Sequence, residues 1–286
     1  MTGVRESIAA VVVLYHPGPE VLANIRSWAD QVDTIFAVDN TEGDASSVAS
    51  TIGALGKVVL VRNGENEGIA RALNTGAERA LAECYDFLLT MDQDSSAASD
   101  MVEKMLACLD GQDFARVGII SPFHMTKSSG NPSVVACQDV MTPMTSGCLL
   151  NLAAYREVGS FRDDLFIDFV DNEFCLRLRK QGFRVLRAND ALLQHSVGDT
   201  HKYGPFIATN HSPLRRYYKT RNRFLVNRLY RRDFPGHCLF DRVRLAKEIV
   251  SIILFEGEKL AKLRMVWRGY RDYRRGKFGM YSGAGG

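Results

Sequence analysis

The chain has 286 residues, enough for one large domain or two modest ones. Hydrophobic residues make up 46% and charged residues 24%, a balance that excludes collagen-like, disordered and disulfide-scaffold classes. The formal net charge is only +3, but 19 Lys and Arg against 6 Asp and Glu lie between Leu214 and Lys277. This asymmetry predicts a polyanionic surface as a partner of the C-terminal part.

The cysteines and the apolar stretches set the expected compartment. The six cysteines show no close pair, which predicts neither a disulfide framework nor a thiolate metal site, and we expect reduced thiols. The N-terminus lacks the pattern of a signal peptide, and the apolar stretch at 249–255 is far shorter than the ~20 residues that span a bilayer. We therefore expect a cytoplasmic protein that touches the inner face of the cell membrane without crossing it.

In chain order, the first half alternates predicted strands and helices. Apolar runs predict strands, and apolar residues at helical spacing predict the helices between them. The strands are expected at 8–14, 34–38, 57–61, 87–91 and 117–120, and the helices at 21–28, 46–55, 68–83 and around 101–106. This alternation predicts an α/β fold with a mostly parallel sheet flanked by helices.

Ligands of such sheets bind beyond the carboxyl ends of the strands. Polar residues follow several of the predicted strands, and they are expected along one edge: His16, Asp39, Asn63, Asp92 and Asp94. A site is therefore predicted at this edge.

The second half is less regular. A helix is predicted from Val170 to Gln181, with Gly182 as its stop signal. After Pro213 the composition becomes rich in arginine, which indicates a boundary. We expect two halves of one domain at 1–98 and 99–213, followed by a basic helical region at 214–286.

Asp92 and Asp94 flank one residue at the end of an apolar strand. Residues two apart in an extended segment project to the same side, so both carboxylates can face one cation. Hard divalent cations such as Mg²⁺ take oxygen ligands and commonly bridge to substrate phosphates. The alternative interpretation is a solvated turn.

Other polar residues suit nucleotide binding. Asp39 at the end of the second strand can accept the imide N–H of a pyrimidine, although an Asp there can also simply form a turn. The loop at 63–68 lacks the G-x-G-x-x-G pattern and a Walker lysine. It is interpreted as a polar loop that leads into the helix carrying Arg71 and Asn74.

Acidic residues gather at the start of the helix predicted from Val170. Asp168, Asp171 and Glu173 can offset the helix dipole, or one of them can act as a general base toward an acceptor hydroxyl. His195 follows an apolar run and is either a third metal ligand or a packed histidine.

These motifs, taken in order, resemble family 2 inverting glycosyltransferases with the GT-A fold, and most closely the bacterial rhamnosyltransferases that use dTDP-L-rhamnose. The resemblance covers roughly residues 8–230. The residues that carry it are Leu14–Pro17, Val38–Asn40, Asn66–Asn74, Met91–Ser95, Thr145–Gly147, Phe166–Arg177 and Gln194–Gly198. A segment from Tyr217 to Asn222 also resembles a Tyr-Tyr-x-x-Arg-Asn pattern of that subgroup, to which we assign no function at this point.

The resemblance implies a function for each matching position. Asp39 and Asn66 hold the nucleotide base and ribose, while Asp92 and Asp94 position Mg²⁺ or Mn²⁺ against the diphosphate, with His195 completing the metal site. Asp171 is the catalytic base, supported by Asp168 and Glu173. The remaining implied positions lie beside the nucleotide sugar (Tyr15, Arg71 and Gln93) or near the acceptor (Thr145, Ser146 and Gly147).

The resemblance also bounds the reaction. The Gln-x-x-Arg-Trp motif of processive members is missing from the sequence, which predicts the addition of one or a few sugars. The expected donor is dTDP-L-rhamnose and the expected acceptor a saccharide or glycolipid, but another donor such as UDP-galactofuranose fits most of the same segments. A polyanion-binding protein without activity is a third interpretation, although no nucleic-acid motif is recognised and we expect no nucleic acid as a partner.

The C-terminal region carries a second pattern. Apolar residues recur at helical spacing from Val243 to Tyr270, with Lys and Arg in most of the gaps, which is typical of basic amphipathic helix. Such a helix can lie on an anionic membrane surface. The alternatives are a helix packed on the main body or in a homodimer interface.

Overall fold

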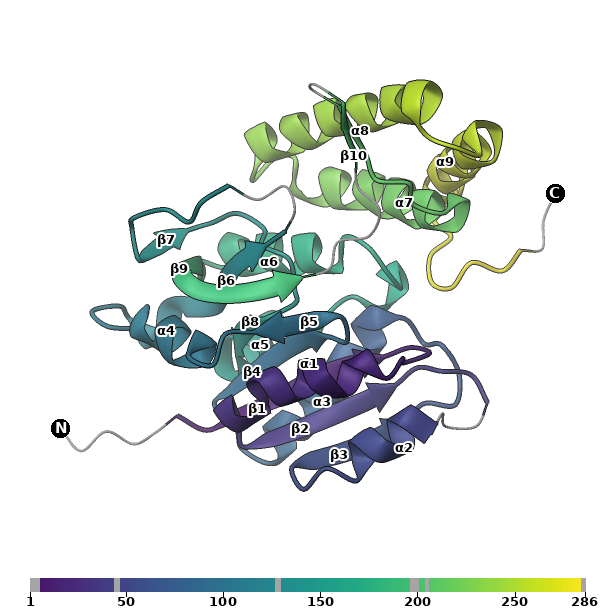
Figure 1. Cartoon of the computed structure of the whole chain (residues 1–286). Helices are drawn as coiled ribbons and strands as arrows, with labels where there is room; N and C mark the ends of the chain where they lie inside the picture. The colour runs from purple at the N-terminus through teal and green to yellow at the C-terminus, as the bar shows by residue number, and fades with distance from the viewer. Residues whose placement is uncertain (1–5, 44–46, 127–129, 196–200, 204–205, 284–286) are drawn as a thin grey trace. The chain divides into compact units, whose positions relative to one another are not determined.

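The computed structural model describes residues 6–43, 47–126, 130–195, 201–203 and 206–283 (Figure 1). The chain folds into two units, one of residues 1–162 and 174–196 and one of residues 163–173 and 197–286. The division falls inside one helix, between Glu173 and Phe174. The division expected from the sequence, at 1–98, 99–213 and 214–286, stays a prediction.

The first unit is built on one nine-stranded sheet with the order β3-β2-β1-β4-β8-β6-β9-β5, and β7 pairs with β9. The strands from β3 to β4 in this order are parallel. Beyond them β8 runs antiparallel to β4 and β6, β9 is parallel to β6, and β5 is antiparallel to β9. The bounds are β1 Ile8–Leu14, β2 Thr34–Asp39, β3 Val58–Arg62, β4 Phe87–Asp92, β5 Ser95–Ala97, β6 Val117–Met125, β7 Cys137–Asp139, β8 Cys148–Asn151 and β9 Arg184–His195.

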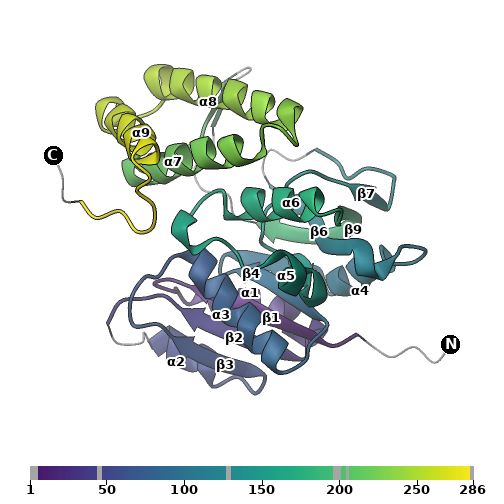
Figure 2. The same ribbon diagram turned by 180° about the vertical axis from the view of Figure 1, so that it is seen from behind.

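Helices cover both faces of this sheet, as the two opposite views show (Figures 1 and 2). The apolar side chains of α1, α2 and α4 pack in one core with alternate residues of β1, while α3, α5 and the second part of α6 lie on the other face. The bounds are α1 Glu20–Trp28, α2 Ser47–Gly53, α3 Ile69–Ala82, α4 Met101–Ala107, α5 Leu152–Val158 and α6 Val170–Lys180, with short 3₁₀ turns at Ala29–Gln31, Phe114–Arg116 and Asp163–Leu165.

The close approach of helix and sheet explains one glycine. Gly76 of α3 lies directly on Val11 of β1, where a Cβ atom would collide with the valine side chain. Alternate residues of β1 thus face the two layers, which is why its whole run is apolar.

One expectation about the cysteines is wrong. Cys108, just after α4, and Cys137 of β7 form a disulfide with a Cα–Cα distance of 5.6 Å. They are 29 residues apart in sequence, and only the folding of the chain brings the two together. Of the other four cysteines, Cys84 is exposed, and Cys148, Cys175 and Cys238 are buried.

The second unit contains a small hairpin and the C-terminal helices. The hairpin pairs β10 His201–Tyr203 with β11 Phe206–Ala208. The helices are α7 Pro213–Tyr230, α8 Pro235–Phe255 and α9 Lys259–Arg274. The Ser212 side chain caps the first turn of α7, and Pro213 occupies its first position, where a missing N–H costs nothing.

The helical C-terminal region that the sequence predicts is confirmed, and its helical spacing from Val243 to Tyr270 is divided between two helices because the chain turns between α8 and α9. Glu256 stands at the break and its carboxylate is buried between Arg216, at 2.5 Å, and Lys262, at 2.9 Å. Continued helix would carry Glu256 away from these partners, and a buried carboxylate without partners is costly. Glu258 then adopts a left-handed backbone, with φ of 51°. No helix among the described residues is long and apolar enough to span a bilayer.

Candidate active site

In the first unit, three of the expected residues lie together at the carboxyl edge of the parallel strands. The last residue of β1, Leu14, pairs with Asp39, and the residue before it, Val13, pairs with Asp92. Tyr15 follows directly and is 42% exposed. The Asp39 carboxylate is buried and accepts the backbone N–H of Thr41 at 3.0 Å, so it also fixes the turn after its strand.

Gln93 joins the two loops at this edge. Its side-chain oxygen accepts the backbone N–H of Tyr15 at 2.9 Å, and its side-chain nitrogen donates to the Tyr15 carbonyl at 3.0 Å. Asn24 of α1 donates to the Gln93 carbonyl at 2.9 Å. The side chain of Gln93 is thus engaged in holding the loops that carry Tyr15 and the two aspartates.

Residues 145–147, the segment expected near the acceptor, contact the loop that carries Asp92. The hydroxyl of Ser146 accepts the backbone N–H of Asp92 at 3.1 Å and donates to the hydroxyl of Ser95 at 2.8 Å. Gly147 donates its N–H to Thr90 of β4, whose hydroxyl in turn donates to the Thr145 carbonyl at 2.6 Å. Ser146 and Gly147 are buried, so this segment packs inside the protein against the loop of Asp92 and Asp94. Acceptor binding by these residues stays a prediction.

The loop that precedes α3 is fixed by asparagines. The Asn66 side chain accepts the Gly68 N–H, and the Asn40 side chain donates to the Gly68 carbonyl, each at 3.0 Å. Arg71, in the first turn of α3, is exposed. Asn74 is buried and contacts Phe161, with its nitrogen donating to the Phe161 carbonyl and its oxygen accepting the N–H. Asn74 therefore anchors the helix.

The residues expected at the metal fit a hard cation. Asp92 and the exposed Asp94 flank Gln93, and the register of the antiparallel strands β5 and β9 places His195 opposite Ser95, next in sequence to Asp94. The side chain of His195 and residues 196–198 of the matching motif lie outside what the structure describes. Among the described side chains, no three of His, Cys, Asp and Glu gather as a metal site. The donor chemistry, two carboxylates at a strand end, suits Mg²⁺ or Mn²⁺.

In the second unit, the segment that leads to Asp171 has an unusual backbone. Phe166, Asp168 and Phe169 all have positive φ, at 65°, 62° and 67°, although none is glycine. Each such residue costs about 1–3 kcal/mol and persists only where the surroundings impose it. Phe166 stacks on Tyr218 at 5.2 Å between ring centroids, which supplies part of that constraint.

Two residues of α7, Asn222 and Arg221, also hold this left-handed backbone in place. The side-chain nitrogen of Asn222 lies 2.9 Å from the Leu165 carbonyl and 2.8 Å from those of Ile167 and Asp168. The Arg221 guanidinium donates to the Leu165 carbonyl at 3.0 Å and is itself almost fully buried. We call these two side chains the loop clamp. The sequence showed the Tyr217–Asn222 pattern, but only the fold gives the clamp its function.

The three expected acidic residues have different surroundings. Asp171 and Glu173 lie in the first turn of α6, and the Asp171 side chain accepts the backbone N–H of Asn172 at 2.8 Å. Glu173 is buried and accepts the hydroxyl of Tyr230 at 2.7 Å. Asp168 lies 3.3 Å from Arg215. Burial raises the pKa of Asp168 above its usual range, although Arg215 and Lys219 oppose that shift.

Comparison with known proteins decides the family. Residues 9–142 match glycosyl transferase family 2. The dTDP-rhamnosyl transferase RfbF of Shigella flexneri is 30% identical over 243 residues, which cover 78% of this chain and 81% of that protein. The chain belongs to glycosyltransferase family 2. It is therefore an enzyme, a glycosyltransferase, as the motifs predict.

Solved structures confirm the GT-A fold of this family 2 enzyme. GalNAc-T7, solved with UDP, GalNAc and Mn²⁺, has a TM-score of 0.56 at 13% identity, covering 66% of this chain. The chain spans only 43% of GalNAc-T7. S. aureus TarS 1–349 has a TM-score of 0.54 at 12% identity, covering 94% of this chain and 72% of that one.

Proposed function

We propose that this glycosyltransferase moves L-rhamnose from dTDP-L-rhamnose to a hydroxyl of a lipid-linked saccharide, in the synthesis of a bacterial cell-surface polysaccharide. The choice of dTDP-L-rhamnose as the donor is supported by the 30% identity to a dTDP-rhamnosyl transferase across 81% of that protein's length. A lipid-linked acceptor agrees with the 19 basic residues of the C-terminal part, because such acceptors lie in membranes of anionic surface charge. The enzyme then works at the inner face of the cell membrane.

The donor is held by the carboxyl edge of the sheet. Asp39 accepts the imide N–H of the thymine base, and Asn66 orients the ribose beside it. Tyr15 is exposed next to Asp39 and offers a ring face to the base, and Arg71 is exposed for a phosphate. Gln93 acts through the loops that it joins.

Asp92 and Asp94, with His195, are the residues that would hold a divalent cation. When bound, Mg²⁺ or Mn²⁺ neutralises negative charge on the departing diphosphate. Ser146 contributes by fixing the backbone of Asp92 from below.

Asp171 is the proposed general base. Its carboxylate takes the proton of the acceptor hydroxyl while that oxygen attacks the anomeric carbon of rhamnose. The bond from that carbon to the diphosphate oxygen breaks in the same displacement, so the configuration inverts and dTDP leaves. Asp168 and Glu173 support this position, Glu173 through its buried hydrogen bond to Tyr230.

Thermal unfolding tests the donor without knowledge of the acceptor. A ligand at 100 times its Kd stabilises the folded state by about 2.7 kcal/mol, which raises Tm by roughly 4–5 °C for a chain of this size. We expect dTDP-L-rhamnose with Mn²⁺ to shift the wild type, and Asp92→Asn to abolish the shift. The matched control is Asp110→Asn, which removes an exposed carboxylate after α4.

The outcomes separate the donors. A shift by UDP-galactofuranose and none by dTDP-L-rhamnose would overturn the proposed donor and leave the family intact. An equal shift of wild type and Asp92→Asn would overturn the proposed metal ligand.

A further inference from the structure

Helix α8 buries two acidic side chains and exposes most of its apolar ones, although Cys238 and Ile252 are buried. Asp241 and Ser251 are buried, and only 19% of the Glu248 side chain is exposed. The opposite face carries apolar side chains that the solvent reaches: Leu239, Phe240, Val243, Ala246, Val250, Ile253 and Leu254. We call these seven residues the α8 apolar face. A helix on a globular protein normally has the reverse arrangement.

Ion pairs hold α8 in this orientation. Arg223 of α7 donates to Glu248 at 2.8 Å and to Asp241 at 3.2 Å. Asn227 also donates to Asp241, at 2.8 Å. Burial alone would raise the pKa of Glu248, but Lys219, Arg223 and Arg216 outweigh it and lower the pKa to about 2. The buried carboxylates of α8 are thus paired with cations and an amide of α7. With these carboxylates turned inward, the α8 apolar face points outward.

The spacing shows that the α8 apolar face is a continuous strip. Positions 239, 243, 246, 250 and 254 follow at intervals of three and four residues, so they lie on one side of the helix. Leu239 is 63% exposed and Leu254 is 56% exposed, near the two ends of the helix. Contiguous apolar surface of this kind marks a place of interaction.

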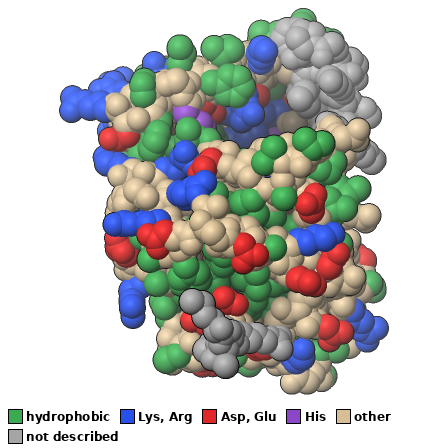
Figure 3. Space-filling model, turned by 90° about the vertical axis from the view of Figure 1, so that its left-hand side faces the viewer, with side chains coloured by type: hydrophobic (Ala, Val, Ile, Leu, Met, Phe, Trp, Pro, Cys, Tyr) green, Lys and Arg blue, Asp and Glu red, His purple; other side chains and the backbone are tan. Residues whose placement is uncertain are grey.

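The charges around the strip identify the partner. Arg242, Arg244 and Lys247 are exposed on the flanks of the same helix, and Arg244 lies over the Phe240 ring at 5.2 Å. The acidic residues within α8, Asp241 and Glu248, are on the buried side and paired. Figure 3 shows hydrophobic side chains interspersed with Lys and Arg over the C-terminal helices.

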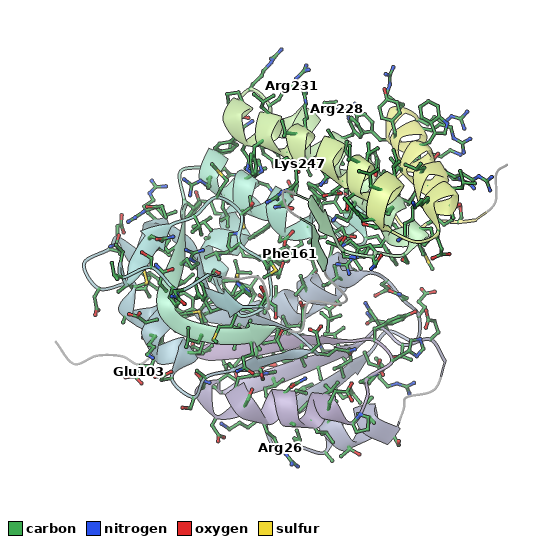
Figure 4. All side chains as sticks on the ribbon, turned by 45° about the horizontal axis from the view of Figure 1, so that its top comes forward. Arg26, Glu103, Phe161, Arg228, Arg231 and Lys247 are labelled. Atoms are coloured by element: carbon green, nitrogen blue, oxygen red, sulfur yellow. A yellow bond between two sulfur atoms is a disulfide. The ribbon has the colours of Figure 1, made fainter. Side chains whose placement is uncertain are left out.

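Two further cations near the end of α7, Arg228 and Arg231, are also exposed. Arg228 and Arg231 reach outward from the end of α7, as Figure 4 shows. Two copies of this chain joined through the strip would bring like charges together, whereas an anionic bilayer offers both acyl chains and negative headgroups. We propose that the α8 apolar face and its flanking cations dock on an anionic membrane surface, with α8 lying in the plane of the interface.

Vesicle flotation of the full-length enzyme tests the proposal. Phosphatidylcholine vesicles with and without phosphatidylglycerol are the probe, and no nucleotide sugar is present, so the result is independent of the donor. We expect binding only to the anionic vesicles, weakened by salt. Replacing the two cations together, as Arg242→Gln with Lys247→Gln, should lower the partition coefficient about thirtyfold, at about fivefold per cation.

The apolar contribution has its own variant and control. Leu239→Ser with Leu254→Ser should abolish flotation without changing Tm, because both side chains are exposed in the free protein. The matched control is Val134→Ser with Val135→Ser, two exposed apolar residues of the first unit, which should float like the wild type.

A gain-of-signal measurement guards against misfolded variants. The chain has two tryptophans, of which Trp28 is buried and Trp267 is 63% exposed. In a Trp267→Phe background, Val243→Trp places a reporter in the strip, and its emission should shift to the blue with anionic vesicles. An unshifted reporter would overturn the proposal. So would a solution dimer that Leu239→Ser with Leu254→Ser dissociates.

Discussion

Replacement of Asn222 by alanine tests whether the loop clamp imposes the strained backbone before Asp171. The Asn222 amide has two N–H groups and faces three carbonyls, so its removal loses at least two buried hydrogen bonds. At about 1 kcal/mol each, the loss is about 2 kcal/mol. The loop also contains three left-handed residues, which gain by relaxing once they are released.

Hydrogen exchange followed by mass spectrometry measures the effect without substrates. The Phe166 N–H donates to the Asp163 carbonyl, and the Ile167 N–H donates to the Leu165 carbonyl. A loss of about 2 kcal/mol corresponds to about thirtyfold faster exchange of these amides in Asn222→Ala. The relaxed loop should also lower kcat, with KM for the donor nearly unchanged, because the proposed donor residues lie elsewhere in the sequence.

Asn227→Ala is the matched control, since it removes one buried hydrogen bond of α7, to Asp241, that does not reach the loop. It should lower the stability by about 1–2 kcal/mol and leave exchange of residues 166–167 near the wild-type rate. If Asn222→Ala exchanges like the wild type, or if both variants accelerate exchange equally, the clamp does not hold the loop.

Three further predictions concern the second unit. Gly269→Ala should destabilise the fold by about 1–3 kcal/mol in urea unfolding, since its Cβ would lie 2.5 Å from the Tyr217 carbonyl oxygen, whereas Gly236→Ala, with open space around it, should not. Burial, with nearby cations, lowers the pKa of His211 from 6.5 to about 3, so folding keeps it neutral. Stability should therefore fall as the pH drops from 6.5 toward 3, and His211→Gln should flatten that decline; an unchanged slope would contradict this. Glu256→Gln should cost about 3–5 kcal/mol because it leaves the buried Lys262 without its carboxylate and removes one of the two carboxylates paired with Arg216, and a loss within the error of the unfolding measurement would show that the pairs are not formed.

Regular parts of the fold follow directly from the sequence, because strong local patterns agree with the tertiary structure. The run from Ile8 to Leu14 is apolar throughout, and only a strand buried on both faces uses such a run. The predicted bounds of β1 agree with the structure, and α6 ends one residue earlier than expected. The edge that carries Asp39 and Asp92 could be predicted as well, since both stand at strand ends.

Other parts depend on distant residues and leave little local trace. The long strand β9 includes polar residues at 189–190, where its register against β6 shifts, and its pattern therefore breaks. The left-handed backbone at Phe166 and Asp168 carries no glycine to signal it. The periodicity of α8 predicts a helix but not which side is buried, because Arg223 on another helix decides that.

The double hydrogen bond between the Gln93 side chain and the Tyr15 backbone has a thermodynamic consequence. The pair of bonds resembles the backbone pairing of two strands and continues it beyond the ends of β1 and β4. It joins the loop of Tyr15 to the loop of Asp92 and Asp94. Any ligand that orders the Tyr15 loop therefore also orders the loop of Asp92 and Asp94. The conformational entropy of ordering is lost once rather than twice, so we expect the two parts of the proposed donor to bind these loops with positive cooperativity. In the proposed function, this glutamine links recognition of the base to binding of the diphosphate.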